Sequence, residues 1–230
     1  SVFHSNFNSD SIKAEKDGNL VLGEDFLAEN EALSNFYLKN DFGSINLTGT
    51  ENQEINIDYT LKVHAEDKEA AEEFIKDLEV IYELQGDRLE IALNKSQTAT
   101  PDLINVVEID YQIRVPEELR AELINKYGSL NVSQLDSELE ASNRYGSTDI
   151  DNIAGPTVVS LDYGEAEITN LASSLELETA YTENTVRNIA GEFDLESAYG
   201  FNRIENIESD LIINSRYGGA EIKEANNIDL

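Results

Sequence analysis

Apolar and polar residues alternate along much of the second half of the chain, as in Leu175, Leu177, Thr179 and Tyr181. A period of two is typical of β-strands that bury one face, because successive side chains of a strand point to opposite sides. The alternation also belongs to a longer repeat. Its first copy spans residues 127–144, the second begins at residue 145, and the later copies follow at the same spacing. Such a repeat indicates a fold built by stacking similar units.

Tyrosine marks every copy of the repeat, at Tyr127, Tyr145, Tyr163, Tyr181, Tyr199 and Tyr217. Gly follows the tyrosine in each copy except one, where Thr182 stands instead. A β-branched aliphatic residue lies five positions after each tyrosine, and an amide lies seven positions after it in five of the six copies. Several columns therefore share one period, which indicates a genuine internal repeat.

A single repeat unit is too short to bury its own apolar face. Stacked units, ~4.8 Å apart, let each strand pair with its own copy above and below. We therefore predict a mainly all-β fold, a single-stranded β-solenoid, over residues 126–230. It should contain about five full rungs and a partial sixth.

Stacking also predicts where each column lies. Because the tyrosines share the parity of the buried leucines, we expect their rings to stack at a corner of the core and to face inward. We expect the following Gly to supply a turn conformation that residues with a Cβ avoid. The amide column should form an asparagine ladder in which each side chain bonds to the backbone of the neighbouring turn.

Residues 1–125 are less regular, and we expect an N-terminal region of strands that continues into the solenoid without a linker. Segment 41–47 repeats the Tyr-Gly pattern with Phe42 in place of tyrosine. Pro116 should end a strand and begin a short turn or coil that runs to Glu122, and residues 95–105 should form a loop. Alternation predicts strands over residues 36–39, 55–63, 80–84, 89–93 and 107–115.

The pattern changes to helical spacing over residues 67–78, where Ala71, Phe74, Ile75 and Leu78 are apolar. This spacing predicts one short amphipathic α-helix inserted between strands. We expect it to carry a Glu72–Lys76 ion pair and to cover part of the sheet or the open end of the solenoid.

Charge and composition exclude several classes of protein. The chain has 47 Asp and Glu against 16 Lys and Arg, a formal net charge of −31, which argues against nucleic acid and anionic membranes as partners. It lacks cysteine, so disulfides, zinc–thiolate sites and iron–sulfur clusters are excluded. No apolar run is long enough to cross a bilayer, so we expect no transmembrane segment. An acidic chain without thiols suits an oxidising exterior better than a cytoplasm.

The inserted-helix segment EDKEAAEEFIKDL, the strand ending YQIRVPEEL and the rungs YGSLNV and YGSTDI together resemble the putative-adhesin β-strand-repeat domains of bacteria, over residues 35–230. These domains are close kin of the head domains of auto-transporter adhesins. The resemblance implies a right-handed solenoid that is exported or attached to the cell envelope. It carries no motif of functional residues and implies no established activity.

The sharpest candidate site is a patch of outward-facing carboxylates, Glu176, Glu178, Asp194 and Glu196, which occupy the same two columns in neighbouring rungs. Oxygen ligands on a rigid lattice suit Ca²⁺, so we consider a calcium site here. Asp149, Asp151 and Glu167 form a second acidic patch of similar geometry. The alternative is that a chain of charge −31 simply carries acids on every solvent face, since no calcium-loop motif occurs.

We find no catalytic motif and predict neither an enzyme nor a bound cofactor. Neighbouring carboxylates resemble the pair of a retaining glycosidase, but such sites need a cleft and a carboxylate of raised pKa. His4 and His64 are the only histidines, and we expect both on the surface. No nucleophile motif such as Gly-x-Ser-x-Gly occurs.

These observations favour an exported or cell-surface scaffold of the adhesin type, which presents a rigid acidic solenoid to a cell-surface glycan or protein. Two alternatives stay open. The sequence stops within its sixth rung with Ile228 and Leu230 still apolar, so we expect either further chain or end-to-end self-association into a filament or envelope subunit. The other alternative is a polysaccharide-active β-helix enzyme.

Overall fold

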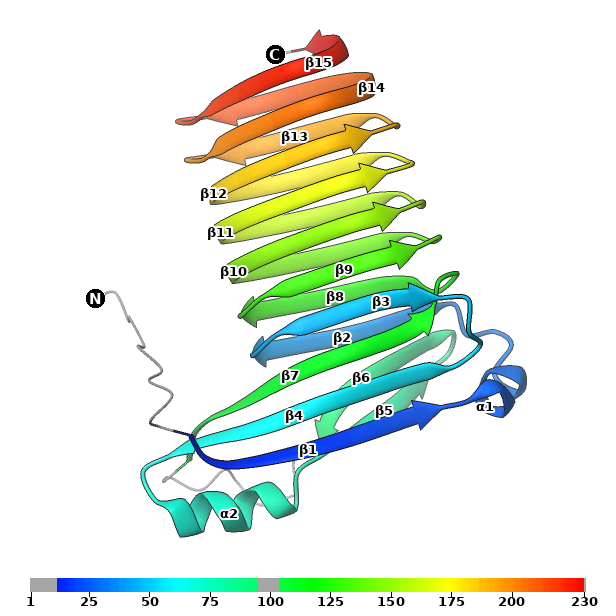
Figure 1. The fold of residues 1–230 in the computed structure, drawn as a ribbon, viewed down its shortest axis with the longest axis vertical. Coiled ribbons are helices and arrows are strands. Elements are labelled where there is room, and N and C mark those ends of the chain that lie inside the picture. Colours follow the sequence, from blue (N-terminus) through cyan, green and yellow to red (C-terminus); the bar gives the residue numbers. More distant parts are fainter. Residues whose placement is uncertain (1–11, 95–103, 230) are drawn as a thin grey trace.

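The computed structural model describes residues 12–94 and 104–229. Most of the chain forms a tower of flat rungs, and the N-terminal strands and two helices lie at its base (Figure 1). The upper part of the tower consists of β10 (Leu139–Ile153), β11 (Thr157–Leu171), β12 (Leu175–Ile189), β13 (Phe193–Ala198), β14 (Phe201–Arg216) and β15 (Gly219–Asp229). The predicted β-solenoid is therefore confirmed.

Successive rungs pair in parallel and in register, so that each residue lies opposite its own copy in the next repeat. Leu139 lies opposite Thr157, which lies opposite Leu175, which in turn lies opposite Phe193. β10, β11 and β12 each bend at their tyrosine, so the first half of the strand belongs to one side of the tower and the second half to the other. β14 contains no tyrosine and spans the opposite bend instead. The rung is thus a flattened loop with two facing sheets.

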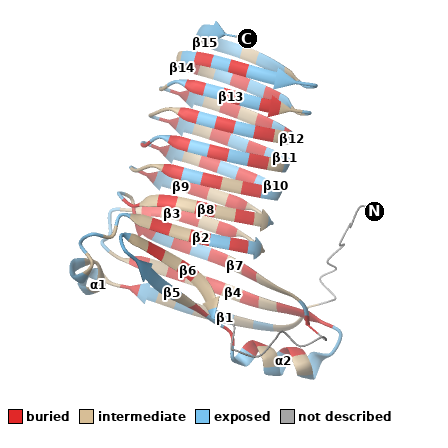
Figure 2. Cartoon of the chain, turned by 180° about the vertical axis from the view of Figure 1, so that it is seen from behind, coloured by how far each residue is buried: buried red, intermediate tan, exposed pale blue. Residues whose placement is uncertain are grey.

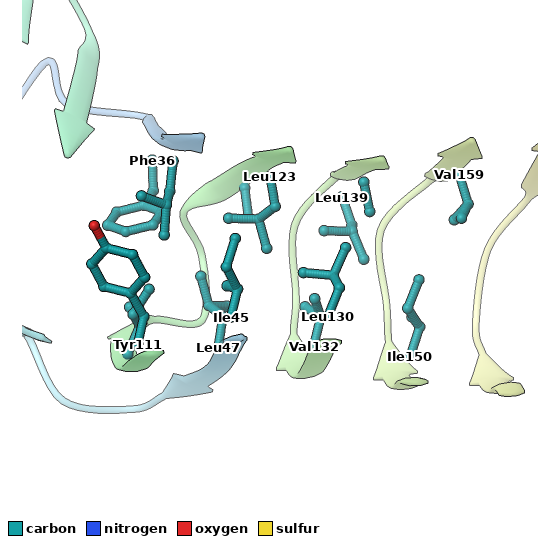
Figure 3. Packing of buried hydrophobic residues seen from close by; sticks show 14 of the residues in the cluster. Phe36, Ile45, Leu47, Tyr111, Leu123, Leu130, Val132, Leu139, Ile150 and Val159 are labelled. Carbon is teal, nitrogen blue, oxygen red and sulfur yellow. The ribbon is translucent and has the colours of Figure 1, made fainter. Parts of the chain in front are cut away.

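Side chains from the two sheets meet in a continuous core. Leu123, Leu139 and Val159 on one side point toward Val132 and Ile150 on the other (Figure 3). All five are at most 2% exposed. Buried and exposed positions alternate along the strands (Figure 2), as the sequence pattern predicted.

The first rung of the tower comes from a distant part of the chain. It consists of β2 (Asn35–Phe42) and β3 (Ile45–Thr50), which stack on β8 (Arg120–Tyr127) and β9 (Leu130–Leu135). Phe42 lies opposite Tyr127, and Leu47 lies opposite Val132. The match between Phe42-Gly43 and the Tyr-Gly repeat therefore marks a true rung, which residues 51–119 separate from the next one.

The intervening residues extend both sheets downward. On one side β7 (Ile104–Pro116) continues in parallel from β3, and β4 (Ile55–Ala65) and β1 (Ile12–Leu22) follow in antiparallel order. On the other side β6 (Arg88–Asn94) pairs with β2 and forms a hairpin with β5 (Glu79–Gln85). The strands predicted in this region are all present. Pro116 ends β7 and a turn follows it, as predicted, but the turn stops at Leu119 instead of Glu122, because β8 begins at Arg120.

The predicted helix is α2 (Lys68–Lys76), which packs against β1 and β4 at the base of the tower (Figure 1). It buries Ala71 and Ile75, and the side chain of Asp67 caps its first turn by accepting a hydrogen bond from the backbone of Ala70. The expected Glu72–Lys76 pair is wrong. Lys76 bonds to Glu73 at 2.7 Å instead, while Glu72 pairs with Lys68.

A second helix, α1 (Glu24–Glu29), was not expected. It is short and buries none of its residues, so it leaves no apolar stripe in the sequence. The predicted loop at 95–105 lies largely outside the described residues, and its last two positions, Ile104 and Asn105, belong to β7.

Candidate binding surface

The six tyrosines of the repeat form one continuous stack of rings, which begins at Phe42. Neighbouring ring centres are 4.8–5.1 Å apart, and neighbouring ring planes differ by at most 13°. We call the seven rings, Phe42 and Tyr127 to Tyr217, the aromatic row. Stacking was predicted from the sequence and is confirmed.

The direction of the row differs from the prediction. Its tyrosines are exposed, from 36% at Tyr127 to 81% at Tyr217, whereas we expected them to face the core. In five of the six copies the cause is local: Tyr145, Tyr163, Tyr181, Tyr199 and Tyr217 have φ between 55° and 61°. A left-handed residue breaks the alternation of the strand, so its side chain leaves the face that simple parity assigns to it.

The glycine after the tyrosine has the expected positive φ in the first copy, at Gly128 (φ 144°), but a different role in later copies. There the positive φ belongs to the tyrosine, and Gly146 and Gly164 do not have it. A Cβ at Gly164 would lie 2.0 Å from the carbonyl oxygen of Gly146 in the rung below. Glycine therefore permits the close approach of consecutive rungs at this corner, and Thr182 is the one copy that carries a side chain there.

A buried polar network lies on the inner side of the same corner, and sequence reasoning missed it. In the lower rungs Asn143 Nδ2 donates to Thr148 Oγ1 at 3.1 Å, and Asn125 Nδ2 lies 3.4 Å from Asn143 Oδ1. In the upper rungs Asn184 Nδ2 donates to Asn202 Oδ1 at 2.8 Å. The signal was present, because Asn125 and Asn143 are themselves separated by one period of the repeat.

The predicted asparagine ladder exists, but its bonds differ from those expected. Asn188 Nδ2 donates to Asn170 Oδ1 at 2.8 Å, and Asn206 Nδ2 donates to Asn188 Oδ1 at 2.9 Å. These residues also have left-handed φ near 57–60°. The ladder therefore joins side chain to side chain on the surface instead of side chain to backbone. Asparagine tolerates the left-handed region better than most residues.

The structure places the predicted calcium ligands next to one another. Glu176 lies opposite Asp194, and Glu178 lies opposite Glu196, all on the exposed face of one sheet. Within the described residues, no group of three or more His, Asp or Glu side chains is arranged to hold a metal ion. The calcium site stays a prediction, and calorimetric titration with Ca²⁺ and the melting temperature in its presence test it.

The second acidic patch is partly neutralised by neighbours. Arg187 binds Glu167 at 2.8 Å, and Thr169 and Asn170 both donate to Asp151. Among the described residues, no such hydrogen bond or ion pair reaches the Asp149 carboxylate. Burial, Glu167 and Asp151 raise the pKa of the Asp149 carboxyl above its ordinary value. It lines a groove of about 360 Å³ together with Glu165, Glu167 and Arg203.

The surface position expected for His64 is wrong. His64 is 2% exposed, and its Nε2 lies 3.0 Å from Glu108 Oε2. Parity correctly places His64 on the opposite side of β4 from Leu61. However, β4 has a neighbouring strand on each side, so His64 is covered by lying between Ile12 of β1 and Val106 of β7. His4 lies outside the described residues.

The polar residues beside His64 tie the insertion to the first rung. Lys62 on β4 bonds to Glu108 and Asp110 on β7, and Asp110 accepts two hydrogen bonds from Ser44 just before β3. Burial alone would raise the pKa of Asp110, but the bonds from Lys62 and Ser44 hold it below its ordinary value. Burial would likewise lower the pKa of Lys62, and the two carboxylates raise it.

A groove of about 990 Å³ runs along the aromatic row on one side. Its walls include Tyr163, Tyr181, Tyr199 and Phe201, and Glu183 lines it as well. Since each ring covers the faces of its neighbours, the row presents mainly ring edges and hydroxyl groups to this groove. The arrangement can donate a series of hydrogen bonds at one regular spacing.

No described helix has the length and apolar character needed to cross a bilayer. No protein-family model matches the sequence, and no curated protein matches it significantly. Structural neighbours exist among solved bacterial proteins.

A putative cell adhesion protein from Clostridium sporogenes is 13% identical, with a TM-score of 0.45, over 92% of this chain and 100% of that one. A putative adhesin from Bacteroides fragilis is 12% identical, with a TM-score of 0.40, over 94% and 99% of the two chains. A putative lipid binding protein from Parabacteroides distasonis is 10% identical, with a TM-score of 0.35, over 92% and 97%.

Proposed function

We propose that this chain is a non-enzymatic binding scaffold of the adhesin type, exported or held at the cell surface, which recognises a glycan or protein partner through its rigid faces. The names of its structural neighbours agree with this proposal. The aromatic row and the acidic surface around it support the proposal most directly.

The exposed row is the observation that carries the proposal. A bulky residue at left-handed φ is strained. The backbone at the five left-handed positions of the row, from Tyr145 to Tyr217, would therefore be better suited by glycine. Tyrosine nevertheless occupies all of them and leaves its hydroxyl in solvent. Backbone strain that is maintained to expose side chains is typical of recognition sites.

Replacing hydroxyl groups while keeping rings tests this function. Tyr163→Phe/Tyr181→Phe/Tyr199→Phe should preserve the stack and the melting temperature. We expect the wild-type chain to bind at least one member of a glycan array or of a panel of purified surface proteins, and the triple variant to bind it about tenfold more weakly. Absence of binding to every member, or equal binding by the variant, would contradict the proposal.

One observation favours the enzymatic alternative, namely a carboxylate of raised pKa, Asp149, in a groove beside Glu167. A polysaccharide-active enzyme should release reducing ends from at least one substrate of a broad panel, and Asp149→Asn should abolish that release. The binding-scaffold proposal expects no release by either chain.

Location and self-association need separate experiments. Labelling of intact cells with a reagent that does not cross membranes should modify the chain if it is displayed outside. Light scattering over a range of concentrations tests the end-to-end association expected from the sequence, and a strict monomer at high concentration would exclude it.

A further inference from the structure

A second groove, of about 300 Å³, lies on the outer face of the sheet that precedes the aromatic row. Ala180 and Ala198 line it, and Glu178 and Glu196 lie beside them, two positions earlier on the same face. Asp162 and Arg216 line it one rung below and one rung above the alanines. We call this space the alanine groove.

The repeat itself indicates what fits in the alanine groove. The column directly before the tyrosines contains Lys126, Arg144, Asp162, Ala180, Ala198 and Arg216. Where this column carries arginine, at Arg144, the side chain binds the carboxylate of the next rung, with Nε 3.3 Å from Asp162 Oδ2. Its guanidinium also lies 5.3 Å from the ring centre of Tyr145. Ala180 and Ala198 bring no cation to this place, and Arg216, which lines the groove above Ala198, forms no ion pair with Glu178 or Glu196 among the described residues.

The carboxylates beside the alanines have no cation of their own. In the described part of the chain, Glu176, Glu178, Asp194 and Glu196 form no ion pair, although they face one another across adjacent rungs. Elsewhere the outer faces carry an arginine between such acids, as Arg187 lies between Glu167 and Glu205. Like charges directly opposite each other on a sheet repel, so an external cation would relieve an existing repulsion.

Resting on the proposed binding function, we propose that the alanine groove binds arginine side chains of an extended basic segment of a partner protein. A guanidinium is planar and forms paired hydrogen bonds to carboxylates, so one group can bridge Glu178 and Glu196 as Arg187 bridges its neighbours. The alanines leave room for the aliphatic stem. The net charge of −31 attracts such a segment from solution.

The probe is a synthetic peptide, acetyl-Arg-Gly-Arg-Gly-Arg-amide, whose alternate side chains point to one face when it is extended. Its affinity for the full chain is measured by calorimetry at about 0.15 M salt, where exposed charges farther apart than about 8 Å are largely screened. We expect Glu178→Gln/Glu196→Gln to weaken binding about tenfold. The lysine analogue should also bind more weakly than the arginine peptide, because its ammonium groups cannot pair with two oxygens in a fixed plane.

Glu192→Gln/Glu208→Gln is the matched control, since it removes the same charge from exposed positions outside the alanine groove. We expect its affinity to stay within about twofold of wild type. Equal weakening by both pairs would mean diffuse attraction to an acidic surface and would overturn the proposal.

Ala180→Arg is a second, independent variant. It supplies within the chain the guanidinium that the partner would bring, so it should abolish peptide binding while keeping or raising the melting temperature. Unchanged binding by a folded Ala180→Arg chain would overturn the proposal. The two proposals can fail separately. If the peptide does not bind as expected, but the triple phenylalanine variant still loses binding to its glycan or protein partner, the alanine groove is excluded and the aromatic row remains the binding site.

Discussion

Tyr145 and its four following copies combine a left-handed backbone with a ring that stacks on both neighbours or, at the end of the row, on one. The conformation by itself costs about 1–2 kcal/mol per residue relative to right-handed alternatives. Stacked aromatic pairs contribute about 0.5–1.5 kcal/mol each beyond their buried area. The two effects are of similar size, so the row persists because every ring has neighbours.

Substitutions at Tyr163 separate these two effects. Tyr163→Phe keeps both stacking contacts and should leave the free energy of unfolding within about 0.5 kcal/mol of wild type. Tyr163→Ala keeps the strained φ but loses both contacts, and should cost about 2 kcal/mol. Tyr163→Gly loses the contacts and relieves the strain, so its free energy of unfolding should lie between those of Tyr163→Phe and Tyr163→Ala. Urea denaturation measures the order, and an alanine variant as stable as wild type would contradict it.

Asp149 provides a residue-scale prediction with a definite pH dependence. Its raised pKa means that the folded state favours the protonated form, so its contribution to stability is most favourable in acid and is lost as the pH rises through the raised pKa. Asp149→Asn should therefore stabilise the chain at pH 7 by about 0.5 kcal/mol, in the range of exposed charge interactions. Thermal melts should show the gain shrinking toward zero as the pH falls below 3.8, the ordinary pKa of the group.

At the scale of elements, the unusual feature is a rung that is completed across a long insertion. β2 and β3 stack on β8 and β9, although residues 51–119 lie between the two pairs of strands in the sequence. Bringing such distant segments together has an entropic cost that grows slowly with length. The Lys62, Asp110 and Ser44 bonds join β4, β7 and the turn before β3, and so help to fix the insertion against this rung.

Asp110→Asn tests that joint. Because the pKa of Asp110 is lowered in the folded state, its ionised carboxylate stabilises the fold at every pH above the ordinary pKa of 3.8. This stabilisation is lost as the pH falls through the lowered pKa of the folded state. The variant should be less stable than wild type by about 1 kcal/mol at pH 7, and the difference should vanish by about pH 2.

Glu83→Gln, at an exposed position of β5, removes the same charge and serves as the control. It should show no comparable difference at either pH in denaturant melts. A constant deficit of Asp110→Asn from pH 7 to pH 2 would mean that the carboxylate charge does not act at this joint.

At the scale of the whole molecule, each rung contacts mainly the rungs above and below it, so stability should be close to a sum over neighbours. The core is continuous through the stack, and no rung has a core of its own (Figure 3). The solenoid should therefore tolerate a change in the number of rungs but not a change in their register.

Removal of residues 157–174 tests this property, since it joins Pro156 to Leu175, the register partner of Thr157. The shortened chain should fold cooperatively and lose about 1–3 kcal/mol, given roughly 0.05–0.15 kcal/mol per residue. Its denaturant m-value should fall with the buried surface. Removal of residues 157–165 alone would place the wrong half-rung over β10, and this chain should not fold. Circular dichroism and urea melts compare the two, and equal behaviour would contradict a register-dependent stack.

Much of the tower could be predicted because its cause is local and repeated. Leu175 and Leu177 alternate with glutamates, and buried and exposed positions alternate again in the neighbouring rungs, so stacking is needed to bury these faces. The helix at Lys68–Lys76 was predictable for a similar reason, since Ala71 and Ile75 mark one buried stripe. The carboxylates Glu178 and Glu196 were predicted as neighbours from the period alone, and they are register partners.

The sequence by itself thus determined the period, the solenoid and which residues share a column, because a fixed repeat with alternating strands has one way to bury its apolar side chains. Only the tertiary structure decided that the tyrosines face solvent, that His64 is buried and that the rung at β2 and β3 precedes β8. A single left-handed φ reverses the side on which a ring lies, and burial of a residue on an outer face depends on strands distant in the chain. Neither is encoded in a local pattern of apolar and polar residues.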